Sequence, residues 1–215
     1  MVKAIIFDLD GTLLNTLRDI CNVLNDSLKK FGVPCLSLEK TIQYVGNGAR
    51  KLVERATVGY DSELIDKIYE DYRVNFAECA NLDTVLYDGE TDFLQRAKAK
   101  GIKMAVVTNK PQKACDKVMS QFFKENYFDY VIGQSDDFAL KPDPSAVNFV
   151  IEKFGVDKSE CLFVGDGDTD VITAKNAGIR CISTLWGFRS QMQLAAVGGR
   201  EFADSFASLG EMINL

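Results

Sequence analysis

The side chains that could carry chemistry in this chain are aspartates and lysines, because the sequence contains no histidine. This excludes a histidine general base, a histidine-dependent catalytic triad, phosphohistidine chemistry and a histidine-ligated zinc. Any acid–base chemistry must therefore come from carboxylates, lysine, tyrosine or cysteine. No cysteine is followed six positions later by arginine, so the C-x5-R loop of the thiolate phosphatases is absent too.

Four short polar stretches carry the candidate residues. They are Asp8-Leu9-Asp10-Gly11-Thr12-Leu13, Thr108-Asn109-Lys110, Lys141-Pro142, and Gly165-Asp166 through Asp170. Three of them directly follow apolar runs, and the carboxyl ends of parallel strands form the ligand-binding edge of an open α/β sheet. Taken singly, such stretches are often only Asx-turns, helix caps or solvated lysines. Their joint placement predicts one site at this edge.

The three aspartates at positions 166, 168 and 170 also imitate the start of an EF-hand loop. That loop needs glycine at its sixth position and glutamate at its twelfth. Here these positions are Val171 and Ala177, so we exclude a calcium-binding EF-hand.

The apolar runs that precede these stretches predict buried parallel strands at residues 4–7, 103–107, 130–133 and 161–164. Continuous rather than alternating apolar residues are typical of strands covered on both faces. Helical patterns separate the later strands, at residues 88–100, 111–119 and 144–154. Alternating strands and helices predict an α/β fold with a doubly wound parallel sheet.

A long interval without strand signals follows the first strand. Apolar residues recur there at helical spacing from Leu17 to Phe31 and from Leu64 to Phe76, and a third helix is expected between residues 48 and 56. We interpret residues 15–83 as a separate, inserted all-α domain. Residues 1–14 and 84–215 would then form a discontinuous α/β core.

Composition restricts the partners and the compartment. The chain has 215 residues, 25 basic against 31 acidic side chains, and a net charge of −6, which argues against nucleic-acid binding. Its six cysteines are scattered without a C-x-x-C pair, as expected for reduced core thiols of a cytosolic protein. There is neither a signal peptide pattern nor an apolar run long enough to span a membrane. We therefore expect a cytoplasmic protein, which would be a monomer or homodimer.

Together, the four stretches resemble, in order and in type, the signatures of the haloacid dehalogenase superfamily of phosphotransferases. The resemblance implies that Asp8 is the nucleophile, giving an aspartyl phosphate, and that Asp10 is the general acid and base. It implies that Mg2+ is held by Asp8, Asp166 and the backbone carbonyl of Asp10, with Asp170 orienting the metal's water ligands. The role of Asp168 stays open between this site and a helix N-terminus.

The resemblance also assigns the transferring phosphoryl group to Thr108, Asn109 and Lys141, whose hydroxyl, backbone N–H and ammonium would contact its oxygens. Dehalogenase members of the superfamily lack the second aspartate of the first signature. Asp10 therefore favours phosphoryl transfer over dehalogenation.

The inserted block resembles the superfamily's small helical cap, and its stretch from Tyr44 to Leu52 resembles the cap loop of phosphoglycolate phosphatases. The stretch Trp186-Gly187-Phe188 matches that branch more loosely, and Asn15 departs from it, since relatives often have Asp at this hinge position. The resemblance implies a phosphatase for 2-phosphoglycolate or a similar small anionic ester. The specificity residues would be Gly46, Asn47, Gly48 and Arg50, with Arg50 either contacting the substrate carboxylate or lying on the outer face of the cap.

Three other functions remain open at this stage. One is a phosphomutase of the β-phosphoglucomutase kind, and another is a pyrophosphatase or nucleotidase of the same superfamily. The third is a binding module that has lost catalysis.

Overall fold

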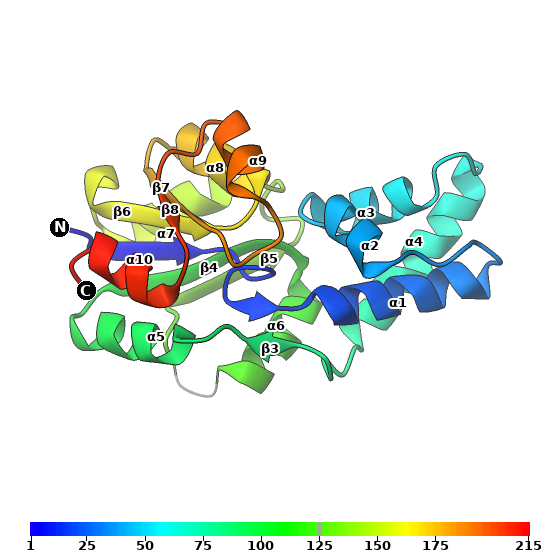
Figure 1. Cartoon of the computed structure of the whole chain (residues 1–215), viewed down its shortest axis with the longest axis horizontal. Helices are drawn as coiled ribbons and strands as arrows, with labels where there is room; N and C mark the ends of the chain where they lie inside the picture. Colours follow the sequence, from blue (N-terminus) through cyan, green and yellow to red (C-terminus); the bar gives the residue numbers. More distant parts are fainter. Residues whose placement is uncertain (124–125) are drawn as a thin grey trace.

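The chain folds into an α/β core and a helical cap at one end of it (Figure 1). The structure is a computed structural model that describes residues 1–123 and 126–215. Within these residues the main sheet has six strands in the order β5-β4-β1-β6-β7-β8, all parallel. The strands are β1 (Ala4–Phe7), β4 (Lys103–Pro111), β5 (Tyr130–Gln134), β6 (Cys161–Gly165), β7 (Arg180–Thr184) and β8 (Phe202–Ala203).

The central strand β1 shows why the runs are continuously apolar. Ile5 and Phe7 point into one hydrophobic cluster, while Ala4 and Ile6 point into a second cluster on the opposite face of the sheet. Successive side chains of a strand point to opposite faces, so a strand covered on both sides needs apolar residues at every position. The doubly wound prediction is confirmed.

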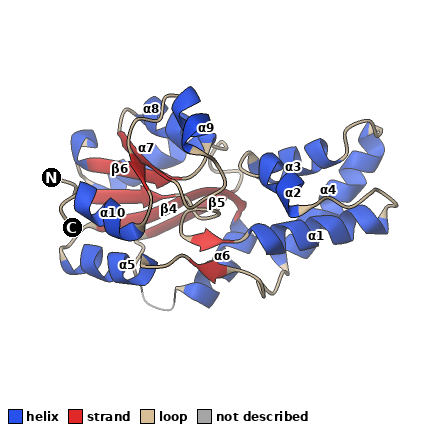
Figure 2. Ribbon diagram, viewed as in Figure 1, coloured by secondary structure: helices blue, strands red, loops and turns tan. Residues whose placement is uncertain are grey.

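Helices cover both faces of the sheet (Figure 2). The helices of the core are α5 (Glu90–Ala99), α6 (Gln112–Phe122), α7 (Ser145–Phe154), α8 (Asp168–Ala177), α9 (Gln191–Ala196) and α10 (Phe206–Met212). Pro111 and Pro144 are the N-cap residues of α6 and α7, so each helix begins one residue later than predicted. Strands β7 and β8 were not predicted, because polar residues interrupt the first and the second has only two residues.

The cap consists of α1 (Leu17–Lys30), α2 (Leu38–Tyr44), α3 (Gly48–Ala56) and α4 (Ser62–Ala77). Its own cluster of buried side chains includes Leu24, Leu28, Val53, Ile68 and Tyr72. The sequence predicted three of these helices and missed the seven-residue α2. The cluster also includes Ala114 of the core helix α6, so the cap packs against the core through it.

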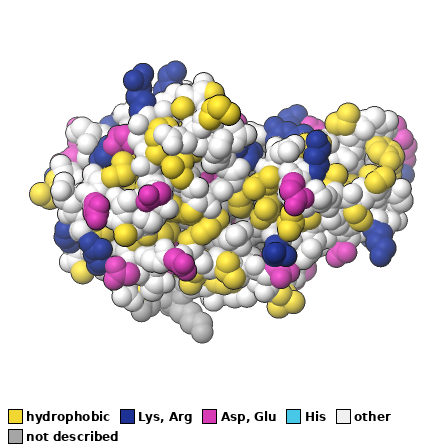
Figure 3. Space-filling view, in the orientation of Figure 1, with side chains coloured by type: hydrophobic (Ala, Val, Ile, Leu, Met, Phe, Trp, Pro, Cys, Tyr) yellow, Lys and Arg dark blue, Asp and Glu magenta, His cyan; other side chains and the backbone are white. Residues whose placement is uncertain are grey.

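The two chain segments that join core and cap lie side by side. β2 (Leu14–Asn15) pairs antiparallel with β3 (Val85–Leu86), so the outgoing and returning segments form a two-stranded link. On the face shown in Figure 3, hydrophobic side chains gather over the region between the two parts. Asn15, the second residue of β2, lies in this two-stranded link.

Two expectations from composition can be compared with the structure. All six cysteines are free, but Cys35 is exposed and Cys79 and Cys181 are only partly buried, so the prediction of core thiols holds for Cys21, Cys115 and Cys161 alone. In the part of the chain that the structure describes, no helix is both long and apolar enough to cross a membrane.

Candidate active site

The predicted residues meet at the carboxyl edge of the sheet, beside its central strand. Asp8 and Asp10 follow β1, Asp166 follows the neighbouring β6, and Thr108 and Asn109 lie at the end of β4 on the other side of β1. After β1 the chain adds β4 and β5 on one side of it and then β6, β7 and β8 on the other. The point where the order reverses is the topological switch point, where α/β proteins bind ligands.

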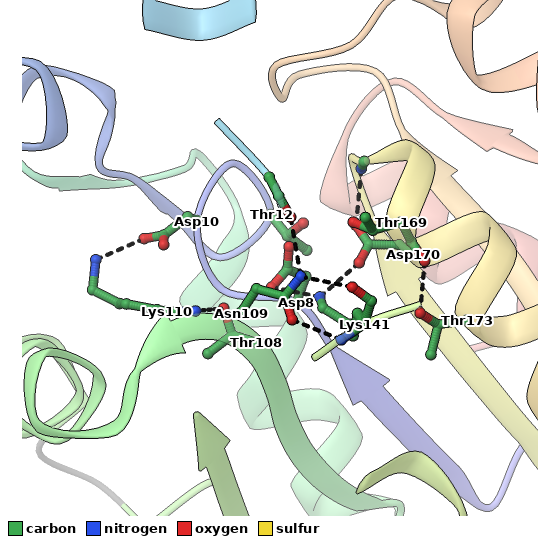
Figure 4. A network of polar contacts seen from close by, with 12 residues as sticks. Asp8, Asp10, Thr12, Thr108, Asn109, Lys110, Lys141, Thr169, Asp170 and Thr173 are labelled. Carbon is green, nitrogen blue, oxygen red and sulfur yellow. Dashed lines mark hydrogen bonds and ion pairs between the residues drawn. The ribbon is translucent and has the colours of Figure 1, made fainter. Parts of the chain in front are cut away.

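Asp8 and Lys141 form the centre of the site (Figure 4). The Lys141 ammonium lies 2.9 Å from Asp8 Oδ1 and 2.6 Å from Asp170 Oδ1, and its side chain is 3% exposed. Burial alone would lower the pKa of Lys141, but the carboxylates of Asp170 and Asp8 raise it, so the lysine remains charged. Burial and repulsion from Asp170 raise the pKa of Asp8 to about 6, against the lowering effect of Lys141.

The position of Lys141 is set by Asn109. The Asn109 side chain accepts a hydrogen bond from the Lys141 backbone N–H at 2.8 Å and donates one to the Lys141 carbonyl at 3.0 Å. It also donates to the carbonyl of Gly46 in the cap at 3.1 Å. The predicted contact of Asn109 with phosphate involves its backbone, so the side chain has a further structural task that the sequence did not indicate.

Two hydrogen bonds and two closely packed glycines fix the position of Asp166. Its Oδ1 accepts a hydrogen bond from Thr12 Oγ1 at 3.0 Å, and its Oδ2 accepts one from the Phe188 backbone N–H at 2.7 Å. A Cβ added to Gly187 would lie 2.2 Å from Asp166 Cβ, and one added to Gly11 would lie 2.4 Å from Asp166 Oδ2. These close approaches leave room only for glycine and fix the carboxylate beside Asp8.

Three carboxylates, those of Asp8, Asp166 and Asp170, offer oxygen atoms within 4.8 Å of one another. Burial, then repulsion from Asp170 and Asp8, raises the pKa of Asp166 to about 8. Asp8 Oδ1 has the Lys141 ammonium as a partner at 2.9 Å. Carboxylate oxygens crowded in this way are the donor set that suits a hard divalent cation such as Mg2+.

Asp170, like Asp166, has a hydrogen-bond donor on each carboxylate oxygen. Oδ1 accepts from Lys141, and Oδ2 accepts from the Gly167 backbone N–H at 2.8 Å. Through its bond to Lys141, Asp170 positions the ammonium beside Asp8. Asp168, the first residue of α8, lies 3.7 Å from Arg189 Nε and has a side chain that is 38% exposed.

Asp10 points away from Asp8 and toward a second lysine. Its Oδ1 accepts a hydrogen bond from Thr16 Oγ1 at 2.7 Å and another from Lys110 Nζ at 3.0 Å. The Lys110 side chain is 1% exposed, and its ammonium lies 4.2 Å from the centroid of the Phe76 ring in the cap. Sequence reasoning did not assign Lys110 a role, although it adjoins Asn109 in a predicted signature.

A cavity of about 60 Å³ lies between the core and the cap. The core contributes Asp8, Asp10, Thr108, Lys110 and Asp166 to its wall. The cap contributes mostly apolar atoms, from Ile20, Val45, Gly46, Gly48, Ala49, Leu52, Tyr72 and Phe76. A space of this size suits a small substrate whose phosphate end faces the polar wall.

The four predicted cap residues divide into two pairs. Gly46 and Gly48 line the cavity with positive φ values of 115° and 84°, which favour glycine. Among the described residues that line it, neither Asn47 nor Arg50 is present.

Of the two placements left open for Arg50, the structure shows the one on the outer face of the cap. Arg50 pairs with Glu54 at 2.9 Å and Asp66 at 2.6 Å, and its side chain is 38% exposed. The buried face of α3 consists of Ala49, Leu52 and Val53. Arg50 follows Ala49 by about 100° around the helix, so burying that face turns the arginine outward.

Arg189 is a cavity-lining cation that the sequence did not reveal. It comes from the loop after β7, and its guanidinium donates to the cap carbonyls of Ile42 at 2.7 Å and Val45 at 2.6 Å. These carbonyls lie at the C-terminal end of α2, where cationic side chains are favoured. Arg189 therefore connects the core to the cap.

Comparison with known proteins agrees with this geometry. Residues 5–184 match the family model of haloacid dehalogenase-like hydrolases. The phosphoglycolate phosphatase 1 of Pseudomonas aeruginosa is 34% identical over 90% of this chain and 73% of its own length. The phosphoglycolate phosphatase of Vibrio parahaemolyticus is 33% identical over 99% of this chain and 96% of its own length.

Solved structures show the same arrangement of core and cap. A crystal structure of a Lactobacillus delbrueckii subsp. bulgaricus protein, described as a candidate phosphoglycolate phosphatase, superposes with a TM-score of 0.93. It is 27% identical and covers 98% of each chain.

Proposed function

Since the chain belongs to the haloacid dehalogenase-like hydrolase family and is a phosphoric monoester hydrolase, we propose that it works through an aspartyl phosphate with Mg2+ as cofactor. The substrate we propose is 2-phosphoglycolate or a similar small anionic phosphate ester. The observation that carries the mechanism is the meeting of Asp8 with Lys141 and Asp166, at a cavity that Asp10 also lines.

In the first half-reaction an Asp8 carboxylate oxygen attacks phosphorus, and the bond from phosphorus to the substrate oxygen breaks. Asp10 donates a proton to the departing oxygen, which leaves as the alcohol. Lys141 and the Thr108 hydroxyl stabilise the charge on the transferring phosphoryl oxygens. Lys141 needs no large movement for this task, because its ammonium already lies beside Asp8.

In the second half-reaction a water molecule attacks the aspartyl phosphate. Asp10 accepts the proton of that water, the bond between phosphorus and Asp8 breaks, and inorganic phosphate leaves. A histidine-free chain requires a carboxylate or similar group for both proton transfers.

Asp8, Asp166 and the backbone carbonyl of Asp10 would hold Mg2+, with Asp170 supporting them. The cation would neutralise the repulsion between the Asp8 carboxylate and the substrate's phosphate dianion. Its fit is supported by the excess of carboxylates over ammonium groups at this centre.

The substrate proposal is supported by the cavity and by the relatives. A cavity of about 60 Å³ with a wall of apolar cap side chains favours a small organic part over a sugar or a nucleoside. The relatives from Pseudomonas aeruginosa and Vibrio parahaemolyticus are both phosphoglycolate phosphatases.

A panel of phosphate esters tests the proposal. Phosphate release from 2-phosphoglycolate, glucose 6-phosphate, a nucleoside monophosphate and pyrophosphate would be compared as kcat/KM, with Mg2+ and with EDTA. We expect 2-phosphoglycolate to be the best substrate and EDTA to stop turnover. Another substrate that wins by tenfold would reject the substrate proposal and leave the mechanism standing.

The variant Asp8→Asn tests the covalent step, because an amide cannot serve as the nucleophile. We expect no turnover, whereas the control Asp92→Asn, an exposed change on α5, should be as active as the wild type. If Asp8→Asn kept a tenth of wild-type activity, the covalent mechanism would be rejected.

A further inference from the structure

Lys110 is a buried cation that the proposed mechanism does not use. In the part of the chain that the structure describes, the only hydrogen-bond acceptor recorded for its ammonium is Asp10 Oδ1, at 3.0 Å. An ammonium has three N–H donors, so this one can bind a further anion. The same ammonium lies 4.2 Å from the Phe76 ring centroid, and Lys110 lines the cavity together with Asp10.

The two buried lysines lie on different sides of Asp8. Figure 4 shows Lys141 beside Asp8 and Asp170, and Lys110 with Asp10 on the other side of Asp8. In an in-line displacement the departing oxygen lies opposite the nucleophile, and the general acid must reach it. A lysine beside the general acid therefore faces the organic part of the substrate.

The surroundings of that organic part leave few other groups that could bind an anion. The cap side of the cavity is mainly apolar, with Ile20, Leu52, Tyr72 and Phe76. A carboxylate placed there without a cation would lose its hydration and gain little in return. Arg189 already donates to the carbonyls of Ile42 and Val45, and Arg50 lies on the outer face of the cap.

We propose that Lys110 binds the carboxylate at the far end of the substrate, so that the enzyme selects phosphate esters whose alcohol part carries a carboxylate. This inference rests on the proposed function and assigns the specificity that the sequence had attributed to Arg50. Lys110 is held by a buried stem at the end of β4, so its ammonium is in place before the substrate enters.

A pair of nearly isosteric substrates isolates the carboxylate. 2-Phosphoglycolate and 2-hydroxyethyl phosphate have the same length and differ only in a carboxylate against a hydroxymethyl group. We expect wild-type kcat/KM to favour 2-phosphoglycolate, and Lys110→Met to reduce that ratio by about 10- to 100-fold, as for a lost hydrogen bond to a charged group. The loss should appear mainly in KM for 2-phosphoglycolate.

Two further variants control for charge and folding. Lys113→Met removes an exposed lysine three residues along and should keep the wild-type ratio. Lys110→Arg keeps the charge and should keep most of the preference. The wild-type ratio itself requires no variant, so the proposal can be refuted even if Lys110→Met fails to fold.

Three results would overturn the inference. They are a wild-type ratio near one, an equal loss on both substrates in Lys110→Met, and a ratio that collapses in Arg189→Met but not in Lys110→Met. An equal loss would mean that Lys110 only positions Asp10. None of these results affects the proposed hydrolase mechanism, which fails separately if Asp8→Asn remains active.

Discussion

The pairing of Lys141 with two buried carboxylates leads to a quantitative prediction for the variant Lys141→Met. The ammonium lies 2.9 Å from Asp8 Oδ1 and 2.6 Å from Asp170 Oδ1. At an effective dielectric constant of about 20, each contact corresponds to about 6 kcal/mol of Coulomb attraction, which the desolvation of the charges largely offsets.

The methionine fills the space of the lysine stem but leaves the carboxylates of Asp8 and Asp170 without their cation. Removing one partner of a buried ion pair costs about 3–5 kcal/mol, so we expect Lys141→Met to lower the free energy of unfolding by this amount in EDTA at pH 8. The variant Asp170→Asn should cost less, because it also removes a negative charge that repels Asp8 and Asp166.

A double-mutant cycle measures the coupling between the two residues. Urea unfolding of the wild type, Lys141→Met, Asp170→Asn and the double variant would give four free energies with comparable m-values. We expect the double variant to be about 2 kcal/mol more stable than the sum of the single changes predicts.

The surface pair Arg180–Glu201 provides the matched control. Its side chains are 35% and 37% exposed, so the cycle of Arg180→Met and Glu201→Gln should give a coupling below about 1 kcal/mol. If Lys141→Met cost less than about 1 kcal/mol, or if its effect simply added to that of Asp170→Asn, the electrostatic account of the site would be refuted.

The remaining predictions concern the metal site, the acid–base residue and an unrelated buried acid. Gly187→Ala places a Cβ 2.2 Å from Asp166 Cβ and should weaken Mg2+ binding by about 10- to 100-fold in calorimetry. The control Gly210→Ala on α10 should leave Mg2+ binding unchanged. Unchanged affinity in Gly187→Ala would show that the close packing around Asp166 is not needed for metal binding. Asp10→Asn should fold normally yet slow both half-reactions in quenched-flow experiments, and unchanged kinetics would move the acid–base role elsewhere. Glu90 is 1% exposed, its Oε1 lacks a partner, and burial raises its pKa from 4.5 to about 7. The folded protein therefore loses stability as pH rises from 4.5 to about 7, because the buried Glu90 carboxyl must ionise. Glu90→Gln should stabilise the protein by up to about 3 kcal/mol at pH 8 and hardly at all at pH 4. An equal gain at both pH values would refute this account.

The fold and the centre of the site could be predicted from the sequence because the relevant signals are local. Apolar runs at every position indicate doubly covered strands, and the polar residues directly after them must lie at one edge of a parallel sheet. Asp8, Thr108 and Asp166 were placed correctly for this reason, and the sheet order later brought them together.

The orientation of Arg50 could also have been predicted, from the helical phase of α3. Ala49, Leu52 and Val53 recur at the spacing of a buried face, and Arg50 is not on it.

Other features depended on the tertiary structure alone. Lys110 adjoins Asn109 in sequence, but only the docking of Phe76 from the cap shows it as a buried cation beside Asp10. Arg189 comes from an irregular loop whose contacts with Ile42 and Val45 span more than a hundred residues. A local pattern determines which face of a strand or helix is buried, whereas the partners of a long charged side chain depend on where the whole cap packs against the core.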